Sequence, residues 1–453
     1  MLSVLLPQLI AAQAQLQSES GLIALDEFRS LTAAGRYAEA LPYAEQLVAS
    51  ADDTHKLVAA LNNLAATHYQ LGDLAAAESN YLRSLISLED SQGISSPGFV
   101  VPLAGLATVY AAQNRHEQAV DFYRQALAVN RRAHGLFNPA QTDLLEALTS
   151  SHMALGHYPA AEAERRYLVQ IAARTYGAED PRIVPALAKL ANWYESVHNY
   201  IAARLVYARM YEIARQESGN SNPAVIDALL GIGRMYRLQF ADDPGSAARP
   251  YSSVNQVMMK TLSGIPWTKR RDFVAPKLDR QGYKALTRAL DALEDLEDPP
   301  AKPMISTLLE LGDWAMASKQ PDLALQHYSR AETIFRDKLE DGDNPPLVAP
   351  RLVIYHPPPS SVTHRLMPRA QVIVRQVNFT LTVTEKGETR DVVLSGSDAN
   401  SMQAFQLQQA LQKASYRPRF EDGRPVATSG VTFTTQWFEL LPTSPEVRPA
   451  GSG

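Results

Sequence analysis

The sequence predicts a mainly α protein, in which an array of stacked helical hairpins is followed by a small α+β domain. Three observations support this fold class. A Gly-x-x-x-Pro motif recurs at constant spacing, and leucines, alanines and tyrosines recur with the same spacing between its copies. Towards the C-terminal end, the helical periodicity of apolar residues gives way to strict alternation. A chain of 453 residues is long enough for both parts.

The Gly-x-x-x-Pro motif marks the junctions between helices. Its copies start at Gly93, Gly135, Gly177 and Gly219, so they lie 42 residues apart. Glycine supplies the left-handed residue that ends one helix, and proline fits the first turn of the next. The residue before each proline carries a side chain that can accept hydrogen bonds from the free N–H groups of a new helix. These predicted capping residues are Ser96, Asn138, Asp180 and Asn222.

The helix interiors keep the same period. The first helix of each pair has leucine at two positions, which predicts one apolar face. These leucines are Leu61, Leu103, Leu145, Leu187 and Leu229, and then Leu64, Leu106, Leu148 and Leu190, with Ile232 completing the second set. The second helix has small residues where helices approach closely and an aromatic residue one turn later. These positions hold Ala77, Ala119, Ala161 and Ala203, and then Tyr81, Tyr123 and Tyr207, with Arg165 as the exception.

The segments LAATHYQLGDLAAAESNYLRSL (64–85) and LATVYAAQNRHEQAVDFYRQAL (106–127) resemble the tetratricopeptide repeat. Their period exceeds the ordinary unit of about 34 residues, and with the Gly-x-x-x-Pro junction they look like the kinesin light chain subtype. Further units extend the resemblance over residues 21–344. The resemblance implies a helical-hairpin solenoid whose first helices line a concave groove for a protein or peptide partner. The leading function is therefore a non-catalytic binding scaffold or assembly factor.

Side chains on the non-core face of the first helices are the predicted ligand-binding residues. They are Asn62, Asn63, Tyr69, Thr108, Asn192, Arg234 and Arg237. Asparagine amides can clamp a peptide backbone, and the two arginines can receive a carboxylate or an acidic segment. The alternative is that these are ordinary exposed helix residues.

The array is predicted to contain an insertion at about residues 241–281, which includes Trp267 and the triplet Lys269-Arg270-Arg271. An insertion on one face of a repeat array serves binding in many repeat proteins, and the alternative is a structural embellishment. After the array, residues 345–365 are rich in proline, which predicts an extended linker.

Residues 366–445 are predicted to form the α+β domain. VIVRQVNFTLTVT (372–384) and TRDVVLS read as a hairpin, FQLQQALQKA as a helix and GVTFTTQWFEL as a last strand. These segments, together with ASYRPRFEDGRPV, resemble the C-terminal domain of TonB-like proteins. The resemblance implies a second candidate function, an energy-transducer-like adaptor that contacts outer-membrane components.

The last strand is predicted to offer an edge for strand addition. Val431, Phe433, Thr435 and Trp437 alternate on one side of it. If this strand lies at the sheet edge, its free N–H and C=O groups can pair with an extended peptide. The alternatives are that a second copy pairs with this edge, or that residues 443–453 cover it.

Several function classes find no support in the sequence. Without cysteine there is no disulfide framework and no thiol chemistry, and a net charge of −5 gives no global attraction to nucleic acid. No phosphate-binding loop, zinc-protease or hydrolase nucleophile motif occurs. We therefore predict no catalytic residue, no metal and no cofactor. An enzyme without a recognisable motif remains a distant third alternative.

The first residues favour an envelope location. MLSVLLPQLIAAQAQ is an apolar run that ends in Ala12-Gln13-Ala14, a pattern typical of signal-peptidase sites, although no basic residue precedes it. Residues 1–20 are therefore predicted to be a signal peptide of a periplasmic protein, and the alternative is a loose first helix. No later stretch has the roughly 20 apolar residues needed to span a bilayer.

Overall fold

The computed structural model describes residues 19–92, 96–219, 222–242, 278–339, 345–358 and 372–440. The chain divides into two compact units, Met1–Leu190 and Ala191–Gly453. The predicted leader up to residue 18, insertion residues 243–277 and linker residues 359–365 lie outside the described residues.

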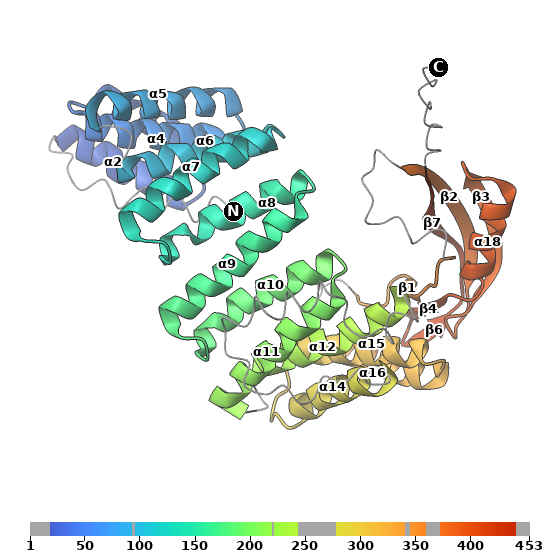
Figure 1. Ribbon diagram of the computed structural model, residues 1–453. Coiled ribbons are helices and arrows are strands. Elements are labelled where there is room, and N and C mark those ends of the chain that lie inside the picture. Colours follow the sequence, from blue (N-terminus) through green and yellow to red (C-terminus); the bar gives the residue numbers. More distant parts are fainter. Residues whose placement is uncertain are drawn as a thin grey trace, which may run out of the picture. The chain divides into compact units, whose positions relative to one another are not determined.

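Unit 1 consists of antiparallel helical hairpins, each packed against the next (Figure 1). Its helices are α2 (Glu19–Ala33), α3 (Tyr37–Ala49), α4 (Thr54–Gln70), α5 (Leu74–Gln92), α6 (Val100–Ala112), α7 (His116–His134), α8 (Thr142–Ala154), α9 (Tyr158–Tyr176) and the start of α10 (Val184–Ser196). The predicted first-helix leucines and second-helix alanines are buried, among them Leu61, Leu103, Leu145 and Ala119. The mainly helical hairpin architecture predicted from the 42-residue period is therefore confirmed.

The helix junctions follow the Gly-x-x-x-Pro motif, except that a short 3-10 turn precedes three of the following α-helices. Gly135, Gly177 and Gly219 adopt positive φ angles of 84°, 107° and 69° at the helix ends. The prolines of the first three motifs begin short 3-10 turns, η2 (Pro97–Phe99), η3 (Pro139–Gln141) and η4 (Pro181–Ile183), which lead into the next helix.

The side chains before these prolines cap the new turns in three of the four copies. The Ser96, Asp180 and Asn222 side chains accept hydrogen bonds from backbone N–H groups two residues later. Asn138 does not cap in this way, because its amide donates backwards to the Gly135 carbonyl oxygen at 2.6 Å.

Two of the repeat tyrosines, Tyr81 and Tyr207, pack on a glycine in the following first helix, whereas Ala147 stands at the equivalent position after Tyr123. A Cβ atom added to Gly105 would lie 2.2 Å from Tyr81 Cζ, and one added to Gly231 would lie 2.5 Å from the Tyr207 ring. Both rings are at most 4% exposed, so they fill the space between the helices. Glycine is needed at these places because the ring occupies the volume of a side chain.

Unit 2 continues the helical pattern with α11 (Tyr200–Ser218), α12 (Pro223–Asp242), α14 (Leu278–Glu294), α15 (Ala301–Ala317) and α16 (Pro321–Lys338). In the last pair, Tyr328 packs on Gly312, where an added Cβ would lie 2.2 Å from the ring. This aromatic–glycine contact lies within one pair, whereas Gly105 and Gly231 belong to the first helix of the next pair.

The C-terminal domain of unit 2 is a three-stranded antiparallel sheet in the order β3-β2-β7, packed against helix α18 (Figure 1). Its elements are β2 (Val372–Val383), β3 (Thr389–Ser397), α18 (Ser401–Leu411) and β7 (Thr428–Leu440). Leu407 and Leu411 of α18 are fully buried against Val377 and Phe379 of β2. The predicted order of hairpin, helix and last strand is present. The TonB-like identity of the domain stays a prediction.

The described part of the predicted linker is not an extended spacer. Residues 351–354 form strand β1 (Arg351–Ile354), which pairs with β4 (Ser415–Arg417). Leu347 is 1% exposed and packs in one cluster with Met316, Tyr328 and Phe420. Proline content restricts only the local backbone, whereas apolar side chains between the prolines bury themselves on α15 and α16.

The aromatic–glycine contact gives the first prediction. Gly105→Ala should lower the free energy of unfolding by about 1–3 kcal/mol, because the new methyl group overlaps the Tyr81 ring. Tyr81→Leu should also destabilise, but it makes room for the methyl group. Urea unfolding of both single variants and the double variant should give a total loss smaller than the sum of the two single losses. Strict additivity would contradict the contact.

Candidate functional site

The second-helix tyrosines also identify the face of the first helix that lies beside the predicted groove. The Tyr123 hydroxyl lies 2.9 Å from Thr108 Oγ1, and the Tyr207 hydroxyl donates to Asn192 Oδ1 at 2.7 Å. Thr108 and Asn192 are both predicted groove residues. In the last pair, the Tyr328 hydroxyl donates to Asp313 Oδ1 at 2.8 Å, with the same separation of 15 residues. Asp313 therefore occupies the corresponding groove position of that pair.

The predicted groove residues of unit 1 fall into two groups. Asn62 and Asn63 are 4% and 3% exposed, so the exposure that the prediction assumed is absent. Asn63 lies 42 residues before Gly105, so it occupies the same repeat position. That position contacts the second helix of the preceding pair, here α3, and this contact explains why Asn63 is buried. Tyr69 and Thr108 are half-buried and reach the surface.

In unit 2, Asn192 is exposed, whereas the two predicted ligand-binding arginines are paired with carboxylates of the chain itself. Arg234 contacts Glu195 at 2.7 Å. Arg237 is 6% exposed and pairs with Glu310 at 3.0 Å and with Asp313 at 3.5 Å. Arg237 is therefore too buried to meet an external ligand, which corrects the exposure predicted for it.

Asp313 joins the helices to the C-terminal domain. Arg417 of β4 donates to both oxygens of Asp313, at 3.0 and 2.8 Å, and both side chains are 4% exposed. Burial by itself would raise the pKa of the Asp313 carboxyl, but Arg417 and Arg237 together hold that pKa below the usual 3.8. Burial and the Asp313 charge raise the pKa of Tyr328 well above 10. In the last pair, α15 and α16, Arg417 of the same chain therefore binds the residue at the groove position, Asp313.

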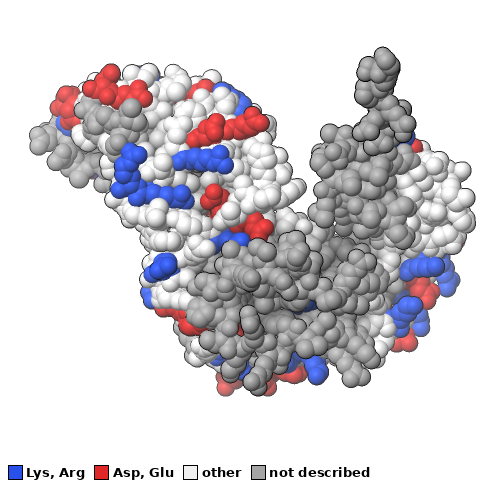
Figure 2. Space-filling model, in the orientation of Figure 1, with Lys and Arg blue, Asp and Glu red and all other residues white. Residues whose placement is uncertain are grey.

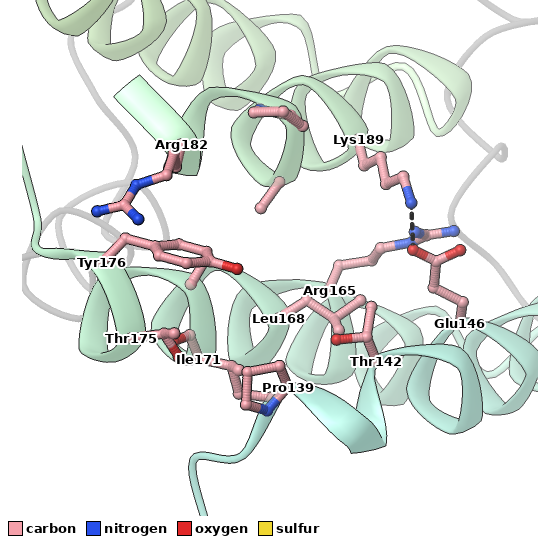
Figure 3. Close-up of a pocket in the computed structure, with 13 residues that line it drawn as sticks. Pro139, Thr142, Glu146, Arg165, Leu168, Ile171, Thr175, Tyr176, Arg182 and Lys189 are labelled. Atoms are coloured by element: carbon pink, nitrogen blue, oxygen red, sulfur yellow. Dashed lines mark hydrogen bonds and ion pairs between the residues drawn. The ribbon is translucent and has the colours of Figure 1, made fainter. Parts of the chain in front are cut away.

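Unit 1 contains a pocket of about 190 Å³ between α8, α9 and α10 (Figure 3). Thr142 and Glu146 of α8 and Lys189 of α10 lie on two successive first helices, and α9 contributes Leu168 and Ile171 between them. The pocket is elongated. Figure 3 shows Arg182 and Tyr176 at one end and Arg165, Lys189 and Glu146 at the other.

The charged groups of the pocket differ in how they are paired. Lys189 forms an ion pair with Glu146. Arg182 binds Asp180 through two hydrogen bonds, stacks 4.6 Å from the centre of the Tyr176 ring and lowers the pKa of Asp180 to about 2. Arg165 makes no hydrogen bond or ion pair with any described residue, and its Nε atom is buried without a partner. Burial lowers the pKa of the Arg165 guanidinium.

The pocket was not predicted, although one signal for it is present in the sequence. Arg165 breaks the tyrosine pattern of the second helices. The position 24 residues later holds Lys189, whereas the equivalent pairs are Tyr81 with Gly105, Tyr123 with Ala147 and Tyr207 with Gly231. Figure 2 shows Lys and Arg interspersed with Asp and Glu on the face of unit 1 that it presents.

The predicted strand-addition residues lie on β7, which is an edge strand. β7 pairs with β2 on one side, and no described strand pairs with its other side. Val431, Phe433 and Thr435 are half-buried and Trp437 is buried, so these four residues face the core of the domain. Their main chain, rather than their side chains, is what the free edge offers.

The described residues contain no group of three or more His, Asp or Glu side chains that could hold a metal ion. Within the same residues, no helix has the length and apolarity required to cross a membrane.

Comparison with known proteins identifies the repeat. Residues 56–132, which span α4 to α7, match the tetratricopeptide repeat family. No curated protein matches the chain.

Three of the solved structures with similarity to the chain carry tetratricopeptide or TPR-like repeats in their descriptions. The kinesin light chain TPR-like repeats of Podosopora anserina are 20% identical, cover 43% of this chain and 94% of their own, and have a TM-score of 0.38. The C-terminal part of a TPR repeat-containing protein from Cytophaga hutchinsonii is 11% identical, covers 69% and 96%, and has a TM-score of 0.43. The TPR2AB domain of yeast Sti1, solved with pHSP90, is 13% identical, covers 70% and 92%, and has a TM-score of 0.25.

The buried Asp313 cluster gives the second prediction. Asp313→Asn should lower the free energy of unfolding at pH 7 by about 3 kcal/mol, because it leaves the buried Arg417 without its carboxylate and Arg237 with Glu310 alone. The lowered pKa means that the carboxylate stabilises the fold above pH 3.8, and that this contribution disappears as the pH falls through the lowered pKa. In urea titrations, the difference in free energy of unfolding between wild type and Asp313→Asn should therefore become smaller below pH 3.8.

A matched surface control is Asp298→Asn, because Asp298 is 93% exposed although it also pairs with a lysine. Its effect should stay within about 0.5 kcal/mol. If Asp313→Asn lowered the free energy of unfolding as much below pH 3.8 as at pH 7, the electrostatic account would be contradicted.

Proposed function

We propose that this chain is a non-catalytic scaffold or assembly factor of the bacterial cell envelope, which binds a peptide segment of a partner protein along the first helices of unit 1. The observation that carries the proposal is the pocket between α8, α9 and α10, which opens among helices of a tetratricopeptide-type array. A cavity of about 190 Å³ is small for a cofactor but suits one or two side chains of a peptide.

The contrast between the two units supports this choice of surface. In unit 2, the guanidinium groups of the groove-side arginines and the Asp313 carboxylate form ion pairs within the chain, and Arg234 keeps only its Nε donor without a partner. In unit 1, Thr108 and Tyr69 reach the surface, and Arg165 retains unused donors. A partner can therefore form more new hydrogen bonds with unit 1, and bury more of its surface there, than with the Asp313 cluster of unit 2, whose groups are already paired.

The proposed location is the periplasm. It is supported by the apolar first residues and by the TonB-like segments of the C-terminal domain. Fractionation of cells that produce the full chain tests the location, and recovery in the cytosol alone would contradict it.

A blocking variant tests the binding surface in the full chain. Ser150 is exposed on α8 at the repeat position of Thr108 and Asn192, and its side chain bonds only the Glu146 carbonyl oxygen. Ser150→Trp should weaken peptides selected from a random display library by about tenfold or more, because the indole covers the mouth of the groove. Affinities are measured by calorimetry.

The matched control is Gln170→Trp, an equally large change at an exposed position of α9. Peptide affinity should be unchanged in this variant. Failure to select any peptide above background, or equal effects of the two tryptophans, would count against peptide binding by unit 1.

The free edge of β7 favours a second candidate function, a TonB-like adaptor that contacts outer-membrane components by strand addition. Along an antiparallel strand, N–H groups point alternately to the two sides, so one of Thr434 and Thr435 directs its N–H to the free edge. Proline at that position should remove one edge donor and reduce co-purification of outer-membrane protein, whereas proline at the other position should disrupt pairing with β2. Undiminished capture by both folded variants would exclude this mechanism.

A further inference from the structure

We propose that the pocket of unit 1 binds a carboxylate group of the partner peptide through Arg165 and Lys189, with an apolar side chain of the same peptide lying over Leu168 and Ile171. This inference rests on the proposed function, since it specifies the chemistry of a peptide that the scaffold binds.

The first argument comes from comparison of the repeats. Tyr81 packs on Gly105 and Tyr207 packs on Gly231, and each ring fills the space between its two helices. Two repeats lie between these pairs. One has Tyr123 and Ala147 at the two positions, and in the other Arg165 replaces the tyrosine and Lys189 replaces the small residue. Both replacements line the pocket. The space that a ring closes in the neighbouring repeats is therefore bordered here by two cations.

The second argument is the unused hydrogen-bonding capacity of Arg165. A guanidinium group has five N–H donors, and Arg165 donates none of them to a described residue. Leaving such a group partly buried and unpaired costs free energy, which a bidentate carboxylate would recover. Burial also lowers the pKa of Arg165, which an approaching carboxylate would oppose.

The third argument is the charge balance. At this end of the pocket, Arg165 and Lys189 face the single carboxylate of Glu146, which pairs with Lys189. Glu146 also attracts Arg165, so two positive charges share one negative charge at this end of the pocket. A ligand with one carboxylate completes two ion pairs, whereas a cationic or neutral peptide leaves Arg165 unpaired.

The fourth argument is the shape and lining of the rest of the pocket. Its volume of about 190 Å³ corresponds to about six water molecules, which exceeds the size of a carboxylate alone. Leu168 and Ile171 form an apolar stretch between the Arg165 end and Tyr176, and Ala172 also lines the pocket. An aliphatic side chain fits this stretch, so a free inorganic anion would leave most of the contact area unused.

The test uses the full chain and four short peptides of otherwise identical sequence. Two are amidated at the C-terminus and contain internal Leu-Asp or Leu-Asn, and two end in leucine with a free carboxylate or an amide. Calorimetry at low salt should show one or both carboxylate peptides binding at least about tenfold more tightly than their amide counterparts. The arm that shows the preference identifies the source as an acidic side chain or a chain end.

Two variants link the preference to the pocket. Arg165→Met keeps the length of the side chain without its donors and should abolish the preference. Arg165→Tyr combined with Lys189→Gly recreates the pair found as Tyr81–Gly105 and Tyr207–Gly231, so it should fold and leave no room for the peptide. Equal binding of all four peptides, or a preference that persists in both folded variants, would overturn the inference.

These outcomes are separable from those of the proposed function. If all four peptides bind equally and Ser150→Trp still blocks them, peptide binding stands and only the carboxylate preference is wrong. If neither these peptides nor any library peptide binds, the proposed function itself fails.

Discussion

The packing of the second-helix tyrosine between first helices is the constraint on which the helical pairs depend. Where the ring lies against Gly105, Gly231 or Gly312, it occupies the volume of the missing side chain. The hydroxyl groups of Tyr123, Tyr207 and Tyr328 reach the groove side of their own pairs, where they meet Thr108, Asn192 and Asp313, respectively. As Tyr207 shows, one repeat tyrosine therefore couples core packing to the proposed binding surface. Replacing it by Arg165 changes both at once, which opens a pocket and supplies a charged donor.

In the Asp313 cluster, side chains of the chain itself occupy the space beside a groove position. Asp313 accepts hydrogen bonds from Tyr328 and Arg417 and lies 3.5 Å from Arg237, so an arginine of strand β4 takes the place that a partner side chain would take. Apolar packing of Leu347 and Phe420 on Tyr328 surrounds the cluster. The last helices and the C-terminal domain thus form one packed body, because removing either side would expose a buried ion pair and an apolar surface. A carboxylate–arginine pair in a groove is the same chemistry that we infer, with the charges reversed, for the unit 1 pocket.

The sequence predicted the features that depend on local periodicity. Helix pairs, positive-φ glycines, three of the four caps and the hairpin of the C-terminal domain follow from short-range rules, and they were found where expected. Pairings between distant residues were not predictable in this way, because Arg417 and Asp313 are 104 residues apart in the sequence. The burial of Leu347 was not predictable either, because no local pattern in the proline-rich segment indicates it. Counting from the leucines also placed Asn63 on the surface, because the count ignores the preceding helix that covers it. Arg165 was visible as an exception to a pattern, but only the packing of α8, α9 and α10 shows that the exception leaves a cavity.

The most direct test of the central claim is a crystal structure of the full chain with an amidated peptide containing Leu-Asp. Our account predicts that the aspartate carboxylate accepts two hydrogen bonds from the Arg165 guanidinium, and that the leucine side chain lies against Leu168 and Ile171 between α8 and α10. A peptide bound elsewhere on the chain, or one in the pocket with its carboxylate pointing to solvent, would contradict the account.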